Sequence, residues 1–283
     1  MFWINKGKGH FRRLGHKMVK DYLSLAWNRN QYINCDYNGF KRNGKMERLL
    51  LLEQKSYCCY CMRTLKYKTH TTLEHVLPHN ANDNEIKNYY LNFNKTFRKN
   101  VRFYLIDKTN ESIKIKVPKY PHFCAYENLV LSCDGSIYGS INDLEKSGSR
   151  LHQCCNNYRG DTEILPMFFL RHIQQYIIYD EDGEVIPKPS LPESLNGALD
   201  NSIRKLNLNH PTLIMIRKAW HNIANEIWNV EQINEAVEAP DRRWEIIQTM
   251  MLSREYSTNL NHKEYWKLLC QYSYFYKYYK EAQ

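Results

Sequence analysis

The sequence lacks any long apolar segment. None of its 283 residues fall in a stretch that approaches the roughly 20 consecutive apolar residues of a membrane-spanning helix, and the apolar run at residues 49–52 is far too short. Residues 1–6 contain no apolar core of the kind found in a signal peptide. We therefore expect no membrane association and a cytoplasmic location.

The chain also lacks internal repeats, and its only biased tract is the tyrosine-rich stretch at residues 272–279. Charged residues make up 25% and hydrophobic residues 43% of the chain, which excludes a disordered or collagen-like protein. The length corresponds to two domain-sized units, or to one catalytic core with substantial additions.

The nine cysteines do not suggest a disulfide framework, because the expected compartment keeps thiols reduced. Clustered cysteines there bind metal or carry out chemistry. Seven of the nine lie between residues 58 and 155. Cys35, Cys124 and Cys270 are expected to be ordinary buried thiols.

Charge is distributed unevenly around the net value of +10. Residues 1–30 contain seven basic side chains and one acid, and residues 87–119 contain nine basic side chains and two acids. Residues 180–200 reverse this balance, with six acids and one basic side chain. A basic first half is typical of proteins that bind nucleic acid, although a solvated basic face has the same composition.

Hydrophobic periodicity predicts helices at both ends of the chain and short strands between them. The spacing of apolar residues predicts helices over 9–30, 45–55, and from 195 onward, and an aromatic-faced helix over 262–280. Turn residues predict hairpins over 101–117 and 177–186.

A Cys-x-x-Cys pair, Cys58 and Cys61, has the spacing of a zinc knuckle, in which two thiolates grip one face of a tetrahedral ion. Two further ligands are required, and Cys133 and Cys155 are the candidates, with the adjacent Cys154 as the alternative to Cys155. A redox pair would be expected at a helix N-terminus within a βαβ unit, which the sequence does not supply.

Between the cysteine pairs lies an acid followed directly by a histidine, Glu74 and His75, with Pro78 shortly after. A neutral imidazole can act as a general base near a scissile phosphate, and a carboxylate oxygen can hold a divalent cation. Neighbouring residues of an extended segment point to opposite faces, so a bend is needed for both to serve one site. Taken alone, the Glu-His dipeptide is common and favours an ordinary strand end.

The order Cys-x-x-Cys, Glu-His-x-x-Pro, Asn-Leu-x-x-x-Cys, Cys-Asn-x-x-Arg-Gly resembles the HNH endonuclease core, the zinc-stapled form of the ββα-metal (His-Me) finger. The resemblance implies that His75 activates water and that Glu74 and Asn156 hold Mg²⁺, with Mn²⁺ as an alternative. It also implies that Asn128 braces the loop and Arg159 lies near the phosphate. Because 21 residues separate Cys133 from Cys155, Asn157 is an alternative to Asn156.

Residues 179–183, 206–209 and 213–217 are similar to the C-terminal part of the PtuB-type HNH subunit of Septu and retron-associated antiphage systems. This resemblance implies a DNA-cleaving effector of bacterial defence that works with a PtuA-type ABC ATPase. An HNH-type nuclease acting on RNA or tRNA, and a non-catalytic zinc-knuckle module that binds nucleic acid, are the alternatives.

The predicted fold class is α+β, a zinc-stapled ββα-metal HNH core with helical N- and C-terminal additions. We expect a basic helical region over 1–56, the nuclease core with insertions over 57–175, and a hairpin plus helical region over 176–283, which is a candidate for partner docking.

Overall fold

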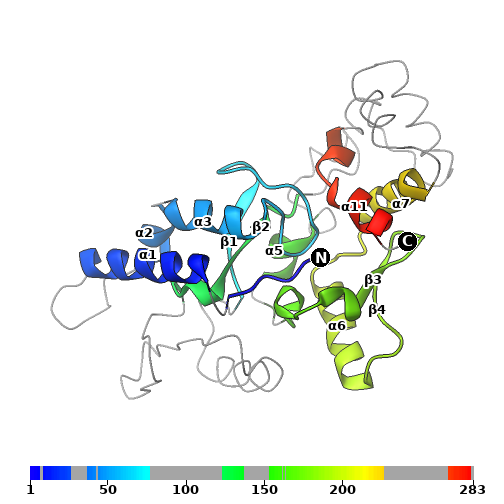
Figure 1. Ribbon diagram of the computed structural model, residues 1–283, viewed down its shortest axis with the longest axis horizontal. Helices are drawn as coiled ribbons and strands as arrows, with labels where there is room; N and C mark the ends of the chain where they lie inside the picture. Colours follow the sequence, from blue (N-terminus) through cyan, green and yellow to red (C-terminus); the bar gives the residue numbers. More distant parts are fainter. Residues whose placement is uncertain are drawn as a thin grey trace. The chain divides into compact units, whose positions relative to one another are not determined.

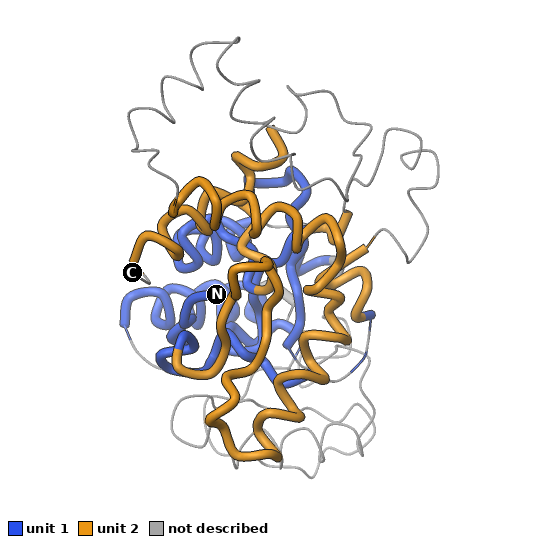
Figure 2. Tube along the Cα trace, turned by 90° about the vertical axis from the view of Figure 1, so that its right-hand side faces the viewer, with its two compact units in different colours: residues 1–59, 65–133, 160–174 blue, residues 60–64, 134–159, 175–283 orange. Residues whose placement is uncertain are grey.

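The computed structural model describes residues 1–6, 9–26, 37–42, 44–76, 123–136, 153–160, 162, 164–225 and 267–281 (Figure 1). The fold is mixed, with helices and two small antiparallel sheets, as the predicted α+β class requires. The chain divides into two compact units (Figure 2). Unit 1 comprises residues 1–59, 65–133 and 160–174, and unit 2 comprises residues 60–64, 134–159 and 175–283. The hairpin predicted over 101–117 and the basic segment 87–119 lie outside the described residues.

Three helices open unit 1: α1 (His10–Ala26), α2 (Tyr37–Arg42) and α3 (Lys45–Glu53). The apolar stripe of α3 buries Met46, Leu49 and Leu50, and α1 packs against this helix. The prediction of a helix over 45–55 is therefore confirmed. The N-terminal helix ends, as far as it is described, at Ala26, and residues 27–30 of its predicted range lie outside the described part.

The sheet of unit 1 pairs β1 (Thr71–His75) with β2 (Leu129–Cys133), in a register that runs from Thr71 opposite Cys133 to His75 opposite Leu129. All five residues of β2 are buried. The Gln54 side chain bonds both backbone groups of Leu131, accepting from its N–H at 2.7 Å and donating to its carbonyl at 2.8 Å. The end of α3 is thereby fixed to the middle of β2.

Unit 2 contains the short helix α5 (Cys155–Arg159), a hairpin of β3 (Ile177–Tyr179) and β4 (Val185–Pro187), and three longer helices. The hairpin pairs Ile177 with Pro187 and Tyr179 with Val185, which confirms the strand pairing predicted there. The helices are α6 (Glu193–Lys205), α7 (Pro211–Asn225) and α11 (Tyr274–Glu281).

A buried arginine on α7, Arg217, holds the hairpin of unit 2. Its guanidinium donates to the carbonyls of Gly183, at 2.7 Å, and of Leu208. The ring of Tyr179 lies 5.5 Å away, and burial lowers the pKa of Arg217. Asn209 extends the clamp, because its side-chain amide bonds both backbone groups of Val185. The motifs over 179–183, 206–209 and 213–217 therefore meet in one packing cluster.

The C-terminal aromatic residues pack within the chain. Helix α11 contacts α7 and buries Phe275 and Tyr279, and the Trp220 indole N–H donates to the Leu269 carbonyl at 3.2 Å. The single helix predicted over 262–280 is wrong in its described part, since a turn at residues 271–273 separates a helical stretch at 267–270 from α11. The turn lets both helical pieces bury apolar side chains.

Among the residues with described positions, no helix combines the length and apolar character that crossing a membrane demands.

Candidate functional site

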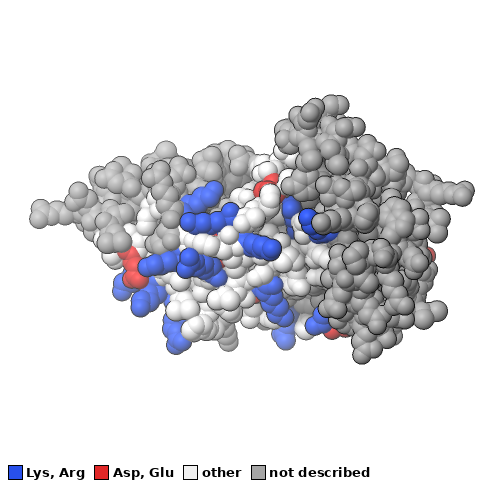
Figure 3. Space-filling model, turned by 90° about the horizontal axis from the view of Figure 1, so that it is seen from above, with Lys and Arg blue, Asp and Glu red and all other residues white. Residues whose placement is uncertain are grey.

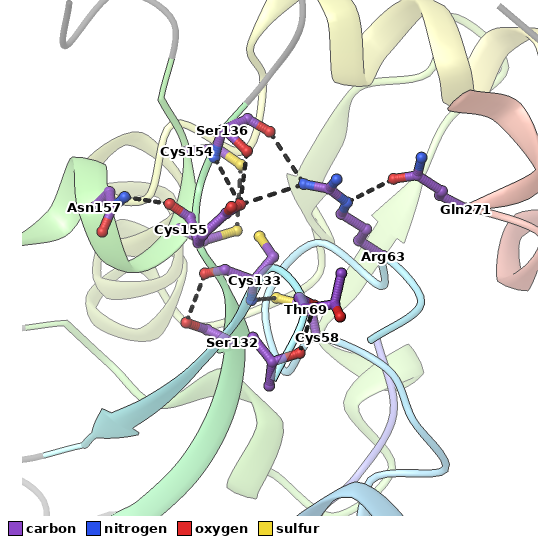
Figure 4. Close-up of polar contacts among 12 residues, drawn as sticks. Cys58, Arg63, Thr69, Ser132, Cys133, Ser136, Cys154, Cys155, Asn157 and Gln271 are labelled. Atoms are coloured by element: carbon purple, nitrogen blue, oxygen red, sulfur yellow. Dashed lines mark hydrogen bonds and ion pairs between the residues drawn. The ribbon is translucent and has the colours of Figure 1, made fainter. Parts of the chain in front are cut away.

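Four buried cysteines gather into one cluster, namely Cys58, Cys61, Cys133 and Cys155, and their sulfur atoms all lie within 4.8 Å of one another. Figure 4 shows the sulfurs of Cys58, Cys133 and Cys155 turned toward a common centre. Within the described ranges, this is the one group of three or more His, Cys, Asp or Glu side chains arranged to hold a metal ion. The quartet is the one predicted from the sequence.

The donor set fits a structural zinc ion. A tetrahedral Zn²⁺ with Zn–S bonds of about 2.3 Å separates its sulfurs by about 3.8 Å, so the cluster needs only a small contraction. The backbone N–H of Cys133 points to the Cys58 sulfur at 3.3 Å, as expected for a donor that stabilises a metal-bound thiolate. Met62, just after the Cys-x-x-Cys pair, has a φ of 63°, which turns the chain sharply behind the knuckle.

The remaining described cysteines lie outside the quartet. The Cys154 sulfur is 3.4 Å from that of Cys155 but does not join the cluster, which agrees with the preference for Cys155. Burial raises the pKa of Cys59, and the neighbouring Cys58 raises it further. Cys124 is buried as predicted, whereas the prediction for Cys270 is wrong, because that side chain is exposed at the end of the helical stretch 267–270.

His75 is the last residue of β1 and is 7% exposed. Its Nε2 lies 2.7 Å from the Phe123 carbonyl oxygen. A carbonyl only accepts hydrogen bonds, so Nε2 carries the proton of the neutral ring and Nδ1 carries the lone pair. The structure thus fixes the tautomer that a general base requires.

Glu74 precedes His75 in the same regular strand and is 4% exposed. Glu74 pairs with Val130 and His75 with Leu129, so the two side chains leave opposite faces of β1. The charge of Glu74 acts on Cys59 and helps to raise its thiol pKa. The chain bends only at Val76, after the pair, so within β1 no bend turns Glu74 and His75 toward one site.

The segment before β2 holds the end of β1 through two carbonyls. The Phe123 carbonyl accepts a hydrogen bond from His75 Nε2, and the Asn128 carbonyl accepts one from the backbone N–H of Val76 at 2.9 Å. Asn128 is fully buried at the end of the short helix η2 (Tyr126–Asn128), and its own N–H donates to Ala125. These contacts are made by the backbone of Asn128, and a bracing role for its side chain stays a prediction.

Helix α1 anchors η2 through a buried carboxylate, Glu127. Its Oε1 lies 2.6 Å from the His16 Nε2 and 3.2 Å from the Arg12 Nε, and the residue is 1% exposed. Gly15 lies between these contacts on α1, and a Cβ there would overlap the Tyr126 ring. The N-terminal helix is thus part of the support for the loop that orients His75.

A second buried ion pair secures the same segment. Lys6 forms an ion pair with Glu53, and the Tyr126 hydroxyl donates to the same carboxylate. The Lys6 ammonium also lies 4.1 Å from the centre of the Tyr126 ring. Burial lowers the pKa of Lys6, and burial beside Glu53 raises that of Tyr126.

The remaining predicted residues lie on α5. Cys155 begins this helix with a φ of 57°, Asn156 is half-buried, and the exposed Asn157 donates to the Asp134 carbonyl. The choice of Asn156 over Asn157 as a metal ligand stays a prediction. Arg159 is 2% exposed and donates to the Tyr60 hydroxyl at 3.2 Å, so its described contact is structural, and its phosphate contact also stays a prediction.

Sequence reasoning missed the supporting residues Lys6, Glu53, Gln54, Tyr126 and Glu127. Each is unremarkable in its local sequence and is identified only by partners that lie between 47 and 115 positions away. The one local signal for any of these residues was the position of Glu127, an acid directly before the predicted site residue Asn128.

No protein-family model and no curated protein matches this chain.

Proposed function

We propose that the chain is a metal-dependent HNH-type endonuclease that cleaves DNA phosphodiester bonds. The observation that carries the proposal is the orientation of His75, whose Nε2–H is held by the Phe123 carbonyl at 2.7 Å so that Nδ1 remains the basic nitrogen. The four-cysteine cluster, which can hold the structural zinc of such a core, adds support. The chain order of β1, β2 and α5 is also the order that the resemblance requires.

In the proposed reaction, Nδ1 of His75 takes a proton from the attacking water. The Phe123 carbonyl stabilises the resulting imidazolium through Nε2–H, and the buried Asn128 keeps the strand end in place. Glu74 and Asn156 are the residues that would hold Mg²⁺, which when bound would neutralise charge on the phosphate. Arg159 would face the same phosphate.

The test is incubation of the protein with supercoiled plasmid and, separately, with tRNA, with Mg²⁺ present or omitted. Omission is preferable to a chelator, because a chelator would also withdraw structural zinc. Mg²⁺-dependent plasmid cleavage is the expected result. Cleavage of tRNA alone would replace DNA by RNA as the substrate, and no cleavage of either would contradict the proposal.

A non-catalytic zinc module that binds nucleic acid is the second candidate. The burial of Glu74 favours it, because a carboxylate only 4% exposed serves packing as readily as metal binding. This candidate predicts nucleic-acid binding without cleavage in the same experiment.

We also propose that the nuclease acts in a bacterial antiphage complex with a PtuA-type ABC ATPase. The acidic hairpin region, where Glu181, Asp182, Glu184 and Glu193 are exposed, supports a protein partner here because it would repel DNA. The aromatic face of α11 is occupied by α7 and is not the proposed contact. Co-purification of the ATPase with the wild-type chain but not with a Glu181→Lys/Asp182→Lys/Glu184→Lys variant is expected, and equal recovery would contradict the acidic contact.

A further inference from the structure

An exposed basic cluster surrounds Tyr67, in the turn before β1. We call it the Tyr67 surface, and it consists of Lys45 and Arg48 on α3 together with Lys66, Tyr67 and Lys68 in the turn. The four cationic side chains are exposed and Tyr67 is half-buried. The turn precedes β1, and His75 is the last residue of that strand, so the cluster is separate from His75.

The Tyr67 ring fixes two of the cations. The Arg48 guanidinium carbon lies 4.5 Å and the Lys68 ammonium 5.3 Å from the ring centre, both within the range of a cation–π contact. The turn is docked on the start of α3, since Glu47 accepts the backbone N–H of Lys68 at 2.8 Å. Gly44 has a φ of 64°, and a Cβ there would overlap the Tyr67 hydroxyl. The arrangement is therefore held in place before any ligand binds.

The charge of this cluster is concentrated and only partly balanced. Glu47 is the neighbouring acid, and one of its oxygens already accepts from the backbone of Lys68. Cations held close together repel one another, and a polyanion relieves that repulsion while it releases its own counterions. Figure 3 shows a face on which Lys and Arg side chains are widespread and acidic side chains are few.

A nucleic-acid backbone fits the Tyr67 surface better than an acidic protein does. Stable protein interfaces have an apolar or aromatic centre, whereas phosphate contacts need only positioned charges and N–H donors. Within the described ranges, Leu52 on α3, 71% exposed, is the single exposed large hydrophobic residue. One such side chain does not make the apolar centre that a protein interface needs. Arg48 and Lys68 both lie over the Tyr67 ring, so we assign the ring to orienting those charges rather than to stacking on a base.

We propose that the Tyr67 surface binds the sugar–phosphate backbone of the nucleic-acid substrate, with Arg48 and Lys68 positioned by Tyr67 against phosphates. The identity of the partner as substrate rests on the proposed nuclease function, whereas the binding itself does not require catalysis.

The test is a titration of a fluorescent DNA duplex by His75→Gln protein without Mg²⁺, at several salt concentrations between 50 and 200 mM. Each lost phosphate contact lowers the slope of log affinity against log salt by about one, so Lys45→Ala/Arg48→Ala/Lys68→Ala should lower it by about three. We expect its affinity to fall by about tenfold or more. The matched control is Arg204→Ala/Lys277→Ala/Lys280→Ala, which removes three exposed charges from α6 and α11 and should change the slope little.

Tyr67 is tested in the same titration. Tyr67→Phe keeps the ring and should bind like the parent, whereas Tyr67→Leu releases both cations and should bind more weakly. An unchanged salt slope in the Tyr67-surface triple variant, or equal losses in both triple variants, would overturn the proposal. Equal competition by polyglutamate would assign the surface to an acidic protein instead and would also overturn it. Absence of cleavage by wild-type protein, with this binding pattern intact, would contradict the nuclease and leave the surface standing.

Discussion

Two buried cations, Lys6 in unit 1 and Arg217 in unit 2, are satisfied in different ways. In unit 1, Lys6 is paired with the carboxylate of Glu53. In unit 2, Arg217 bonds neutral oxygens of Gly183, Leu208 and Asn209 and lies against aromatic rings. The stabilisation of a buried cation with one charged partner is lost when that partner is removed. The stabilisation of a cation held by several neutral groups is shared among them, so removal of one group costs less.

The two cations also lie in regions to which we assign different proposed roles. The charged pairs of unit 1 converge on the segment that contains Tyr126 and Glu127, and this segment orients His75. The contacts of Arg217 close a hairpin onto α7. We therefore expect charge-altering substitutions in unit 1 to affect activity as well as stability, and those around Arg217 to affect stability alone.

Loss of a zinc ligand should have the largest effect. Cys58→Ser should abolish stoichiometric zinc binding and the hydrogen-exchange protection of β1 and β2, because structural zinc contributes about 10–16 kcal/mol of apparent binding free energy. Zinc analysis and hydrogen-exchange mass spectrometry provide the measurement, with the exposed Cys270→Ser as control. If β3, β4 and α7 lose protection to the same extent, the cysteine cluster also supports the part of unit 2 that Arg217 holds, and the contrast between the two regions fails.

Breaking the Lys6–Glu53 pair from one side should have the next largest effect. Glu53→Gln leaves the buried ammonium of Lys6 without its counter-charge, at a cost of about 3–5 kcal/mol in unfolding free energy. Lys6→Met/Glu53→Gln should recover much of that loss, as a double-mutant cycle in urea would reveal.

The corresponding change in unit 2 is Arg217→Met, which leaves only neutral acceptors unpaired. Its cost should be smaller than that of Glu53→Gln, at about 1–3 kcal/mol. A cost for Arg217→Met that exceeds that of Glu53→Gln would reverse the comparison.

Alkaline pH should destabilise unit 1 through Tyr126. Burial beside Glu53 raises the pKa of Tyr126 in the folded state, so the unfolded state releases this proton first, above about pH 10. Stability is therefore present below pH 10 and falls as pH rises beyond it, by up to about 1.4 kcal/mol per pH unit for one tyrosine. Tyr126→Phe should flatten this decline in urea unfolding between pH 9 and 11, and an unchanged slope would contradict the assignment.

The exposed pair of Arg204 and Asp200 should have the smallest effect. Its nitrogen and oxygen atoms lie 3.0 Å apart on the surface of α6, with side chains 72% and 47% exposed. Asp200→Ala should change the unfolding free energy by less than about 0.5 kcal/mol, because solvent screens such pairs. A larger loss, measured by urea unfolding, would show that burial is not what distinguishes the ion pairs of unit 1.

The sequence predicts those parts of the molecule whose signal is local. The Cys58–Cys61 spacing, the turn residues between β3 and β4, and the apolar spacing of α3 each lie within about ten residues, and all three are confirmed. The quartet was completed by Cys133 and Cys155 through the order of motifs rather than through local spacing.

The remainder of the candidate site could not be predicted, because its contacts join distant positions. Glu127 meets His16 across 111 residues, and Gln54 meets Leu131 across 77. The aromatic periodicity of the C-terminus identified a buried face correctly but not its partner, which is α7 of the same chain. Periodicity predicts that a face is covered and gives no information about what covers it.

The most direct test of the proposed nuclease activity is the rate of Mg²⁺-dependent plasmid cleavage by His75→Gln. Glutamine can place an N–H donor where His75 Nε2 bonds the Phe123 carbonyl, so the fold, the zinc content and the melting temperature should be preserved while the basic Nδ1 is lost. His70→Ala, at an exposed histidine before the same strand, is the control and should cleave like wild type. A loss of about 10²–10⁴-fold in the cleavage rate is expected for His75→Gln alone. Cleavage within a few-fold of wild type by a folded, zinc-loaded His75→Gln protein would contradict it.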